Sequence, residues 1–322
     1  MNILILKPRI YYSQILNEWL ENRKNSIKES SYNKYLTSIE NNIIPHLGNI
    51  DIKKLKDSDI YNYFNTEKIL SLSDSTRKIL YIIITSSLNY SIENKYIKSF
   101  PKLNVKLKAP KHRVIYFTQK EQSIFEKYIL DNMSLNNLGL LLALYTGIRI
   151  GELCALQWKD IDFINNTISI TKTVQRVKNK EKDSKLKTKL IVTPPKTEHS
   201  IRTIPVPKFV MSILKEYKKD NEIFIFNDSN NPKDTRAFEK YFERVLKKCK
   251  IKNLNFHSLR HTFATRSRES GMDIKILSEL LGHSSYKITL EIYVHTSLDF
   301  KKDSVNSLVK YLKPKKMSVE LG

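Results

Sequence analysis

The stretch PKLNVKLKAPKHRVIY, residues 101–116, constrains the fold most, because it divides the 322-residue chain into two parts. It combines prolines and basic residues without a sustained hydrophobic period, which is typical of a linker. Directly after it, Thr118 stands three residues before Glu121, the spacing of a capping box that opens a helix. The sequence therefore predicts an N-terminal extension at 1–10, a first domain at 11–100, the linker at 101–116, a second domain at 117–300 and a tail at 301–322.

The first domain has apolar residues at helical spacing. This period runs through residues 15–20 and again through residues 35–44. The following PHLGN segment is expected to stop the second of these helices, with Gly48 at its end. Further helices are expected around residues 61–64 and 79–92. We therefore expect a compact all-helical domain with short connections.

The second domain has mixed character. NLGLLLALYTG, residues 137–147, predicts a buried helix that ends in a turn, and TISITKTVQRV, residues 167–177, alternates as a strand does. Residues 178–189 are charged and are interpreted as the solvated tip of a hairpin, after which residues 190–206 resume an extended pattern. Helices are expected from Asp234 onward. The predicted fold class is mainly α with a small antiparallel β-sheet (α+β).

The chain is strongly basic, with 56 Lys and Arg against 33 Asp and Glu, a net charge of +23 and a pI of about 9.7. Both halves carry the excess, which favours a polyanionic partner, and nucleic acid is the first candidate. A lysine-rich composition that follows from AT-biased coding is the alternative explanation.

Composition also limits the compartment and the kind of site. The two cysteines, Cys154 and Cys249, have no paired metal-ligand spacing, so neither a disulfide framework nor a zinc knuckle is expected. The N-terminus lacks a signal-peptide core, and no apolar run approaches membrane-spanning length. We expect a cytoplasmic protein without a membrane partner.

Three separated stretches could carry chemistry: TGIRIGELCAL, PPKTEHSIRTIPV and HSLRHTFATRSRESG. In TGIRIGELCAL, Arg149 begins a helix between apolar positions that would draw it inward, where it needs either a carboxylate such as Glu152 or a bound phosphate. In HSLRHTFAT, the residues His257, Arg260 and His261 share one helix face. This motif resembles half of a zinc-protease helix, but a serine replaces the general-base glutamate and an arginine would repel a divalent cation, so an anion site is favoured.

A further stretch, LGHSSYKITLEIYVH at residues 281–295, holds two tyrosines and two histidines. From the residues alone they could be surface groups, metal ligands or the reactive end of an enzyme.

In this order the motifs resemble the tyrosine recombinase, or phage integrase, family. The resemblance covers residues 117–300 closely, and residues 11–100 look like the core-binding domain of that family. The residues that carry it are Arg149 in TGIRIGEL, Lys196 in PPKTEHSIRTIPV, His257 and Arg260 in HSLRHTFAT, His283 in LGHSS, and Tyr293 in EIYVH.

The resemblance implies a role for each residue in the cleavage of a DNA phosphodiester. Tyr293 would be the nucleophile that forms a 3′-phosphotyrosine. Arg149, Arg260 and His283 would stabilise charge on the non-bridging oxygens, as bidentate guanidiniums and an imidazole donor can.

The remaining residues have proton-transfer or supporting roles in this interpretation. His257 would accept the proton of the tyrosine, and Lys196 would protonate the departing 5′-oxygen. Glu152 would orient its neighbours, and His261 and His295 would be supporting or solvent-facing. Tyr286 lies too close to His283 for the spacing of the family and is expected to be a packing or surface residue.

The resemblance also implies partners. The two domains would form a C-shaped clamp on double-stranded DNA recombination sites, and four copies would assemble in a synapse that passes through a Holliday junction. No cofactor, metal or ATP is expected. An accessory factor that sets the direction of the reaction is expected as a partner. The helical spacing of Leu308, Val309 and Leu312 in the tail fits packing on a neighbouring subunit or on its own domain. The short segment before the first helix predicts no separate arm-site domain.

Other functions stay open on the sequence alone. A dimer resolvase of the same family, a type IB topoisomerase and a DNA-binding regulator on the same fold share much of the pattern. A metallohydrolase is a further alternative. An integrase of a phage or a conjugative element, acting in the bacterial cytoplasm at the nucleoid, is the expected function.

Overall fold

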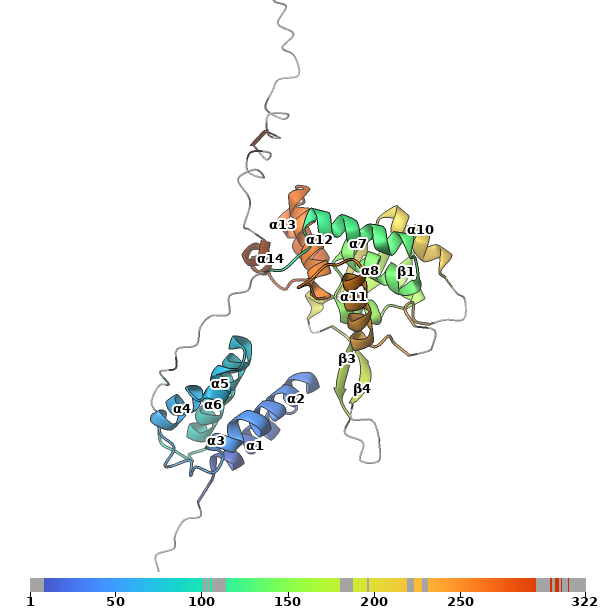
Figure 1. The fold of residues 1–322 in the computed structure, drawn as a ribbon. Coiled ribbons are helices and arrows are strands. Elements are labelled where there is room, and N and C mark those ends of the chain that lie inside the picture. Colours follow the sequence, from blue (N-terminus) through green and yellow to red (C-terminus); the bar gives the residue numbers. More distant parts are fainter. Residues whose placement is uncertain are drawn as a thin grey trace, which may run out of the picture. The chain divides into compact units, whose positions relative to one another are not determined.

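A computed structural model describes residues 9–100, 103, 105, 114–179, 188–195, 197–218, 223–227 and 231–293, with 302, 305, 306, 308 and 312 of the tail. The chain divides into two compact units, residues 1–112 and 113–322 (Figure 1). No helix within these described stretches has both the length and the apolar content needed to cross a membrane.

The first unit is built of helices, as predicted, and an isolated β-bridge joins Tyr11 to Asp51 within its described residues. Its elements are α1 (Tyr12–Asn22), α2 (Glu29–Ser38), a π-helical turn (Ile39–Ile43), α3 (Ile44–Leu47), α4 (Asp57–Phe64), α5 (Glu67–Leu70) and α6 (Asp74–Glu93). Tyr12 and Trp19 of α1 lie in its core, and the Tyr12 hydroxyl lies 2.7 Å from Ser87 Oγ of α6. Leu103 and Val105 pack against the same core.

The predicted stop within PHLGN is confirmed, although the helical path continues through Pro45 to Leu47 before it ends. A proline ring clashes with the carbonyl four residues earlier and cannot donate to it. The chain accommodates Pro45 with a π-helical turn, in which the N–H of Ile44 donates to the carbonyl of Ile39. The carbonyl of Asn41 accepts from Lys68 Nζ at 3.0 Å instead. The helix ends at Gly48, as predicted, where a Cβ would lie 2.6 Å from the Ile44 carbonyl oxygen.

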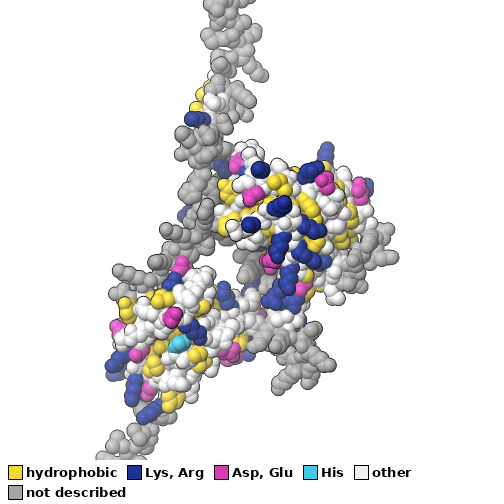
Figure 2. Space-filling model, viewed as in Figure 1, with side chains coloured by type: hydrophobic (Ala, Val, Ile, Leu, Met, Phe, Trp, Pro, Cys, Tyr) yellow, Lys and Arg dark blue, Asp and Glu magenta, His cyan; other side chains and the backbone are white. Residues whose placement is uncertain are grey.

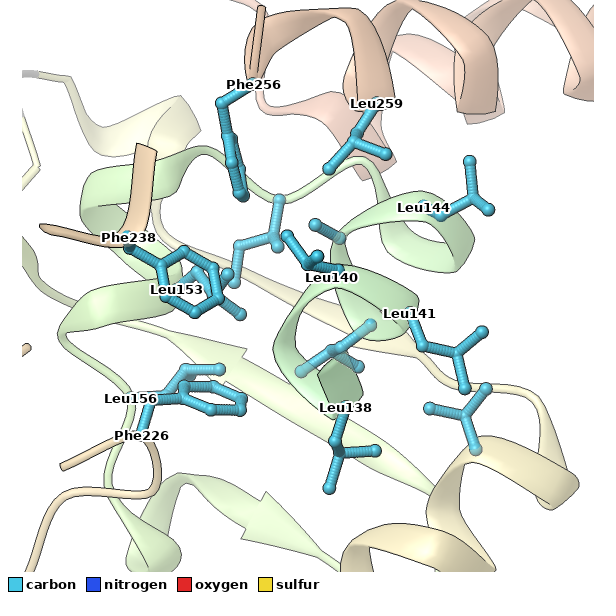
Figure 3. Close-up of a cluster of buried hydrophobic side chains, with 14 of the residues drawn as sticks. Leu138, Leu140, Leu141, Leu144, Leu153, Leu156, Phe226, Phe238, Phe256 and Leu259 are labelled. Carbon is cyan, nitrogen blue, oxygen red and sulfur yellow. The ribbon is translucent and has the colours of Figure 1, made fainter. Parts of the chain in front are cut away.

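The second unit surrounds a buried helix with further helices and two small sheets. Its helices are α7 (Gln119–Asp131), α8 (Leu135–Thr146), α9 (Ile150–Cys154), α10 (Lys208–Glu216), α11 (Thr235–Lys248), α12 (His257–Glu269), α13 (Ile274–Leu281) and α14 (Tyr286–Tyr293), with 3-10 turns at Trp158–Asp160 and Glu198–Ser200. The predicted capping box is confirmed: Thr118 Oγ1 accepts from the N–H of Glu121, whose carboxylate accepts from the N–H of Thr118. Figure 3 shows Leu140 and Leu141 of α8 inside the cluster, with Phe238, Phe256 and Leu259 around them.

The expected single small sheet is two separate sheets. Strands β1 (Ile161–Asp162), β2 (Thr167–Ile170) and β5 (Arg202–Pro205) form one antiparallel sheet in the order β1-β2-β5, and β3 (Thr173–Lys178) and β4 (Thr188–Thr193) form a hairpin. The strand predicted at 167–177 is interrupted at residues 171–172, and Lys172 Nζ pairs there with Asp160 Oδ2 at 2.7 Å. The hairpin is as predicted, but its tip lies outside the described residues.

Helix α10 and the tail are the two remaining segments. Helix α10 was not predicted, although Val210, Met211 and Leu214 have helical spacing and are buried. In the tail, Leu308 and Leu312 are helical and exposed, and Val309 lies outside the described residues.

Basic side chains gather on one face of the second unit. Figure 2 shows Lys and Arg side chains across the face that carries α11 and the β3–β4 hairpin. On α11 the exposed basic residues are Arg236, Lys240, Arg244, Lys247 and Lys248. Their charge lies on the side of α11 that faces away from the core, since Phe238, Phe242, Val245 and Leu246 of the same helix are buried.

Candidate active site

Arg149 is placed by a tight turn between two helices. Gly147 ends α8 with φ +63°, a left-handed conformation in which a Cβ would lie 2.6 Å from the Phe263 ring. Two residues later, Arg149 is the N-cap of α9, and its backbone N–H donates to Glu152 Oε2 at 3.1 Å. Its Nη1 also lies 2.7 Å from Glu152 Oε1, so the predicted carboxylate partner is confirmed. The Arg149 side chain stays 34% exposed, which leaves it accessible to a ligand.

Glu152 joins Arg149 to a second arginine that the sequence analysis missed. Arg202 stands at the start of β5 with its side chain 6% exposed, and it places Nη2 2.8 Å from Glu152 Oε2 and Nη1 3.2 Å from Oε1. Burial opposes ionisation of Glu152, but its hydrogen bonds and charge interaction with Arg202, and then Arg149, lower the pKa overall. The carboxylate is therefore ionised and holds the two guanidiniums together.

The C-terminal end of α13 is the meeting point of three arginines from separate elements. Cations are favoured there because the unpaired carbonyls carry partial negative charge. The contacts are Arg202 Nε to the Leu280 carbonyl at 2.6 Å, Arg260 Nη2 to the Leu281 carbonyl at 2.6 Å and Arg149 Nη2 to the Gly282 carbonyl at 3.1 Å. These bonds join β5, α12 and the start of α9 at one point.

Arg260 lies in the interior, with 3% of its surface exposed. Its Nη1 donates to the Gly147 carbonyl at 2.9 Å, in addition to its bond to α13. The guanidinium thus links the ends of α8 and α13, and its orientation is fixed by both carbonyls.

His283 follows Gly282, which ends α13 with φ +63°. Its Nδ1 lies 2.8 Å from Oγ1 of Thr289, a buried residue of α14. Burial first, and then the charges of Arg260, Arg149 and Arg202, lower the pKa of His283 to about 3. The imidazole is therefore neutral at neutral pH and has one N–H to donate.

His257 and His261 lie one turn apart at the start of α12, as predicted. Their rings meet edge to face with centroids 4.5 Å apart. Burial lowers the pKa of each to about 4, with a second contribution from Arg260 for His257 and from His257 for His261. Both are neutral near pH 7 and can accept a proton. Within the described residues, no group of three His, Cys, Asp or Glu side chains is placed to hold a metal ion.

Two adjoining cavities lie against these residues. One of about 410 Å³ is lined by Arg149, Glu152, Gly282 and His283, among others. The second, of about 370 Å³, is lined by Arg149, His257 and Arg260. Arg149 and Thr173 line both cavities.

The structure thus brings together five of the predicted residues and leaves others undescribed. Arg149, Glu152, His257, Arg260 and His283 surround the cavities, with His261 beside His257. Lys196 and His295 lie outside the described residues, but Pro195 and Thr197 line the larger cavity. Tyr293 is the last residue of α14, and its side chain also lies outside the description. Tyr286 is 54% exposed, as predicted.

We expect Glu152→Gln to lower the free energy of unfolding by about 3–5 kcal/mol at neutral pH, because it leaves the guanidinium of Arg202, whose side chain is 6% exposed, without its counter-charge. The lowered pKa means that ionised Glu152 stabilises the fold above its unfolded value of 4.5, and this contribution is lost as pH falls through the folded pKa. The difference between wild type and variant should therefore narrow in acid, as measured by urea unfolding at several pH values.

Glu269→Gln provides the matched control. Glu269 pairs with Arg266 but its side chain is 45% exposed, so its loss should cost less than about 1 kcal/mol. Equal costs for the two variants, or a Glu152→Gln deficit that persists unchanged at about pH 3, would contradict the structural role of Glu152.

Comparison with known proteins matches both units to one family. The family model described as "Phage integrase family" matches residues 116–299. The family model described as "Phage integrase, N-terminal SAM-like domain" matches residues 11–68. These ranges cover the cavities and the start of the helical unit.

Relatives agree with this match over most of their length. The tyrosine recombinase XerC-like protein of Caldanaerobacter subterraneus is 30% identical over 303 residues, which cover 87% of this chain and 76% of the relative. The ICEBs1 integrase of Bacillus subtilis is 23% identical over 313 residues, covering 93% and 83%.

A solved structure shares the fold. The Tn1549 transposon integrase, in complex with transposon right end DNA, has a TM-score of 0.77 at 23% identity and covers 93% of this chain and 100% of that chain. With the family matches and the 30% identical relative, these findings show that the chain belongs to the phage integrase family and is a tyrosine recombinase, an enzyme that breaks and rejoins DNA.

Proposed function

We propose that this tyrosine recombinase is the integrase of a mobile genetic element and that its active site is the pair of cavities around Arg149. The observation that carries the proposal is the convergence of Arg149, Arg260 and His283 beside these cavities, with α14 beginning three residues after His283. Two guanidiniums and a neutral imidazole form a donor set for a phosphodiester that uses no metal.

In the reaction, the scissile phosphate occupies the site at Arg149. Attack on phosphorus builds negative charge on the non-bridging oxygens, and preorganised donors stabilise that charge. Arg149 and Arg260 are already oriented by the carbonyls at the end of α13, so little reorganisation is needed when the charge develops. His283 donates the third hydrogen bond.

Proton transfers accompany bond formation and bond cleavage. The phenol oxygen of Tyr293 attacks phosphorus, and the phenol proton passes to His257, whose imidazole is neutral because burial lowers its pKa to about 4. The bond from phosphorus to the 5′-oxygen breaks, and Lys196 supplies the proton to this oxygen. The product is a 3′-phosphotyrosine, and a different 5′-hydroxyl reverses the step to complete strand exchange. Neither ATP nor a metal is consumed.

The exposed basic residues of α11 and the net charge of +23 support binding to duplex DNA, because contacts to phosphates release counterions. The first unit serves as the core-binding domain, and both units bind the recombination site. A lambda integrase structure is a tetramer bound to a Holliday junction, which supports a homotetrameric synapse for this chain as well. An accessory factor would set the direction of the reaction.

A nicked duplex provides the test. When the nick lies beside the scissile phosphate, the short leaving strand diffuses away, so the protein stays attached to DNA. We expect a denaturation-resistant adduct in the presence of a chelator, and peptide mapping should place the DNA on the peptide that contains Tyr293. An adduct on another peptide, or one that requires a divalent metal, would contradict the proposal.

A synthetic Holliday junction distinguishes a recombinase from a topoisomerase of the same chemistry. We expect the junction to be resolved to exchanged duplexes. Relaxation of supercoiled DNA without junction resolution would favour the topoisomerase.

A further inference from the structure

Thr289 makes an unusual contact for a buried helical threonine. In a helix the hydroxyl of threonine commonly bonds the carbonyl four residues earlier. Two other buried threonines do so here, with Thr262 Oγ1 2.8 Å from the Ser258 carbonyl and Thr146 Oγ1 2.6 Å from the Leu142 carbonyl. Thr289 is fully buried in α14, yet its Oγ1 lies 2.8 Å from His283 Nδ1.

This contact couples the direction of the Thr289 hydroxyl to the tautomer of His283. A neutral imidazole has one N–H and one acceptor nitrogen, and the partner of one nitrogen fixes the state of the other. If the Thr289 hydroxyl donates to Nδ1, the proton must be on Nε2. His283 lines the larger cavity together with Arg149, so an N–H on Nε2 is available for a ligand there.

The contact also joins two segments that the reaction must align. His283 belongs to the turn after α13, whereas Thr289 lies within α14, four residues before its end at Tyr293. Positions four residues apart lie on one face of a helix. A bond from Thr289 to His283 therefore sets the position of α14 relative to the turn that holds the imidazole.

We propose that Thr289 is a positioning residue, which donates its hydroxyl hydrogen to Nδ1 of His283 and thereby holds the imidazole as a donor on Nε2. For its effect on DNA cleavage this inference rests on the proposed function. The effect of Thr289 on the tautomer of His283 does not depend on the proposed function, and it can be measured on the free protein.

Two substitutions separate the hydroxyl from the shape of the side chain. Thr289→Val keeps the volume and removes the hydroxyl, whereas Thr289→Ser keeps the hydroxyl. We expect Thr289→Val to slow single-turnover cleavage of the nicked substrate by about 10–100-fold, the usual cost of losing a group that orients a reacting side chain. Thr289→Ser should stay within about fivefold of wild type. Similar losses for both variants, or no loss for valine, would overturn the inference.

A double-variant comparison tests whether Thr289 acts through His283. In a His283→Gln background, Thr289→Val should cause little additional loss, because the group it positions is already gone. If the two losses multiply instead, Thr289 acts on α14 alone and the inference is wrong.

The tautomer gives a readout that needs no DNA. Nitrogen NMR of the free protein at neutral pH should show His283 protonated on Nε2 in the wild type and in Thr289→Ser, and a mixture of tautomers in Thr289→Val. A wild-type proton on Nδ1 would refute the inference even if cleavage occurs. Conversely, the expected tautomers without any covalent adduct would refute the proposed function and leave the tautomer result intact.

Discussion

Replacing Tyr293 by phenylalanine is expected to abolish the covalent adduct with DNA, a loss on the order of 10⁴-fold or more in cleavage, as the removal of a nucleophile typically causes. A tyrosine hydroxyl has a pKa of about 10 and attacks poorly unless cations and a base are close to it. Helix α14 ends at Tyr293 and is joined by a short turn to His283, which lies among the arginines of the site. Single-turnover reactions with the nicked duplex measure this loss.

Tyr286→Phe is the matched control for Tyr293→Phe. Tyr286 is the first residue of the same helix and is 54% exposed, so its hydroxyl should be dispensable. We expect adduct formation within about twofold of wild type, and both variants should bind DNA in mobility-shift assays. Loss of the adduct in Tyr286→Phe, or its survival in Tyr293→Phe, would assign the nucleophile to another residue.

Local signals in the sequence predicted much of the fold, because they depend on neighbouring residues only. The capping box at Thr118 and the turn at Gly147 are of this kind, and both are present. Pro45 shows the limit of such signals, since proline predicts a helix end. Here a π-helical turn accommodates the proline, and Lys68 donates to the Asn41 carbonyl, to which the proline cannot donate. Lys68 belongs to another helix, so this hydrogen bond has no local signal in the sequence.

The candidate site shows the same division between local and distant contacts. Arg149, Glu152 and Arg260 could be recognised because each stands in a short motif. Arg202 was missed because its bond to the Leu280 carbonyl joins positions 78 residues apart, and nothing near it in the sequence indicates such a partner. A charged residue at the start of the short strand RTIP was the one available signal.

Arg260→Lys is expected to reduce single-turnover cleavage by about 10²–10³-fold, the usual cost of losing a preorganised donor to a developing charge. Lysine keeps the positive charge, but its single ammonium lacks the planar fork that presents two donors at fixed positions. In the wild type, Nη1 and Nη2 reach the carbonyls of Gly147 and Leu281, which belong to different helices. One ammonium cannot reproduce this geometry at position 260, where the arginine is only 3% exposed.

Arg266→Lys, on the same helix, separates a defect in catalysis from a defect in folding. Arg266 also links distant segments, since its Nε donates to Gln122 Oε1 and its Nη2 to the Phe117 carbonyl, but it borders neither cavity. We expect a lower unfolding temperature with cleavage within about threefold of wild type at a temperature where the variant is folded. If Arg260→Lys cleaves as fast as Arg266→Lys under those conditions, the Arg260 guanidinium has a structural role alone. If it binds DNA, stays folded and still fails to cleave, the effect lies in the chemical step, because the charge is retained and the fork is lost.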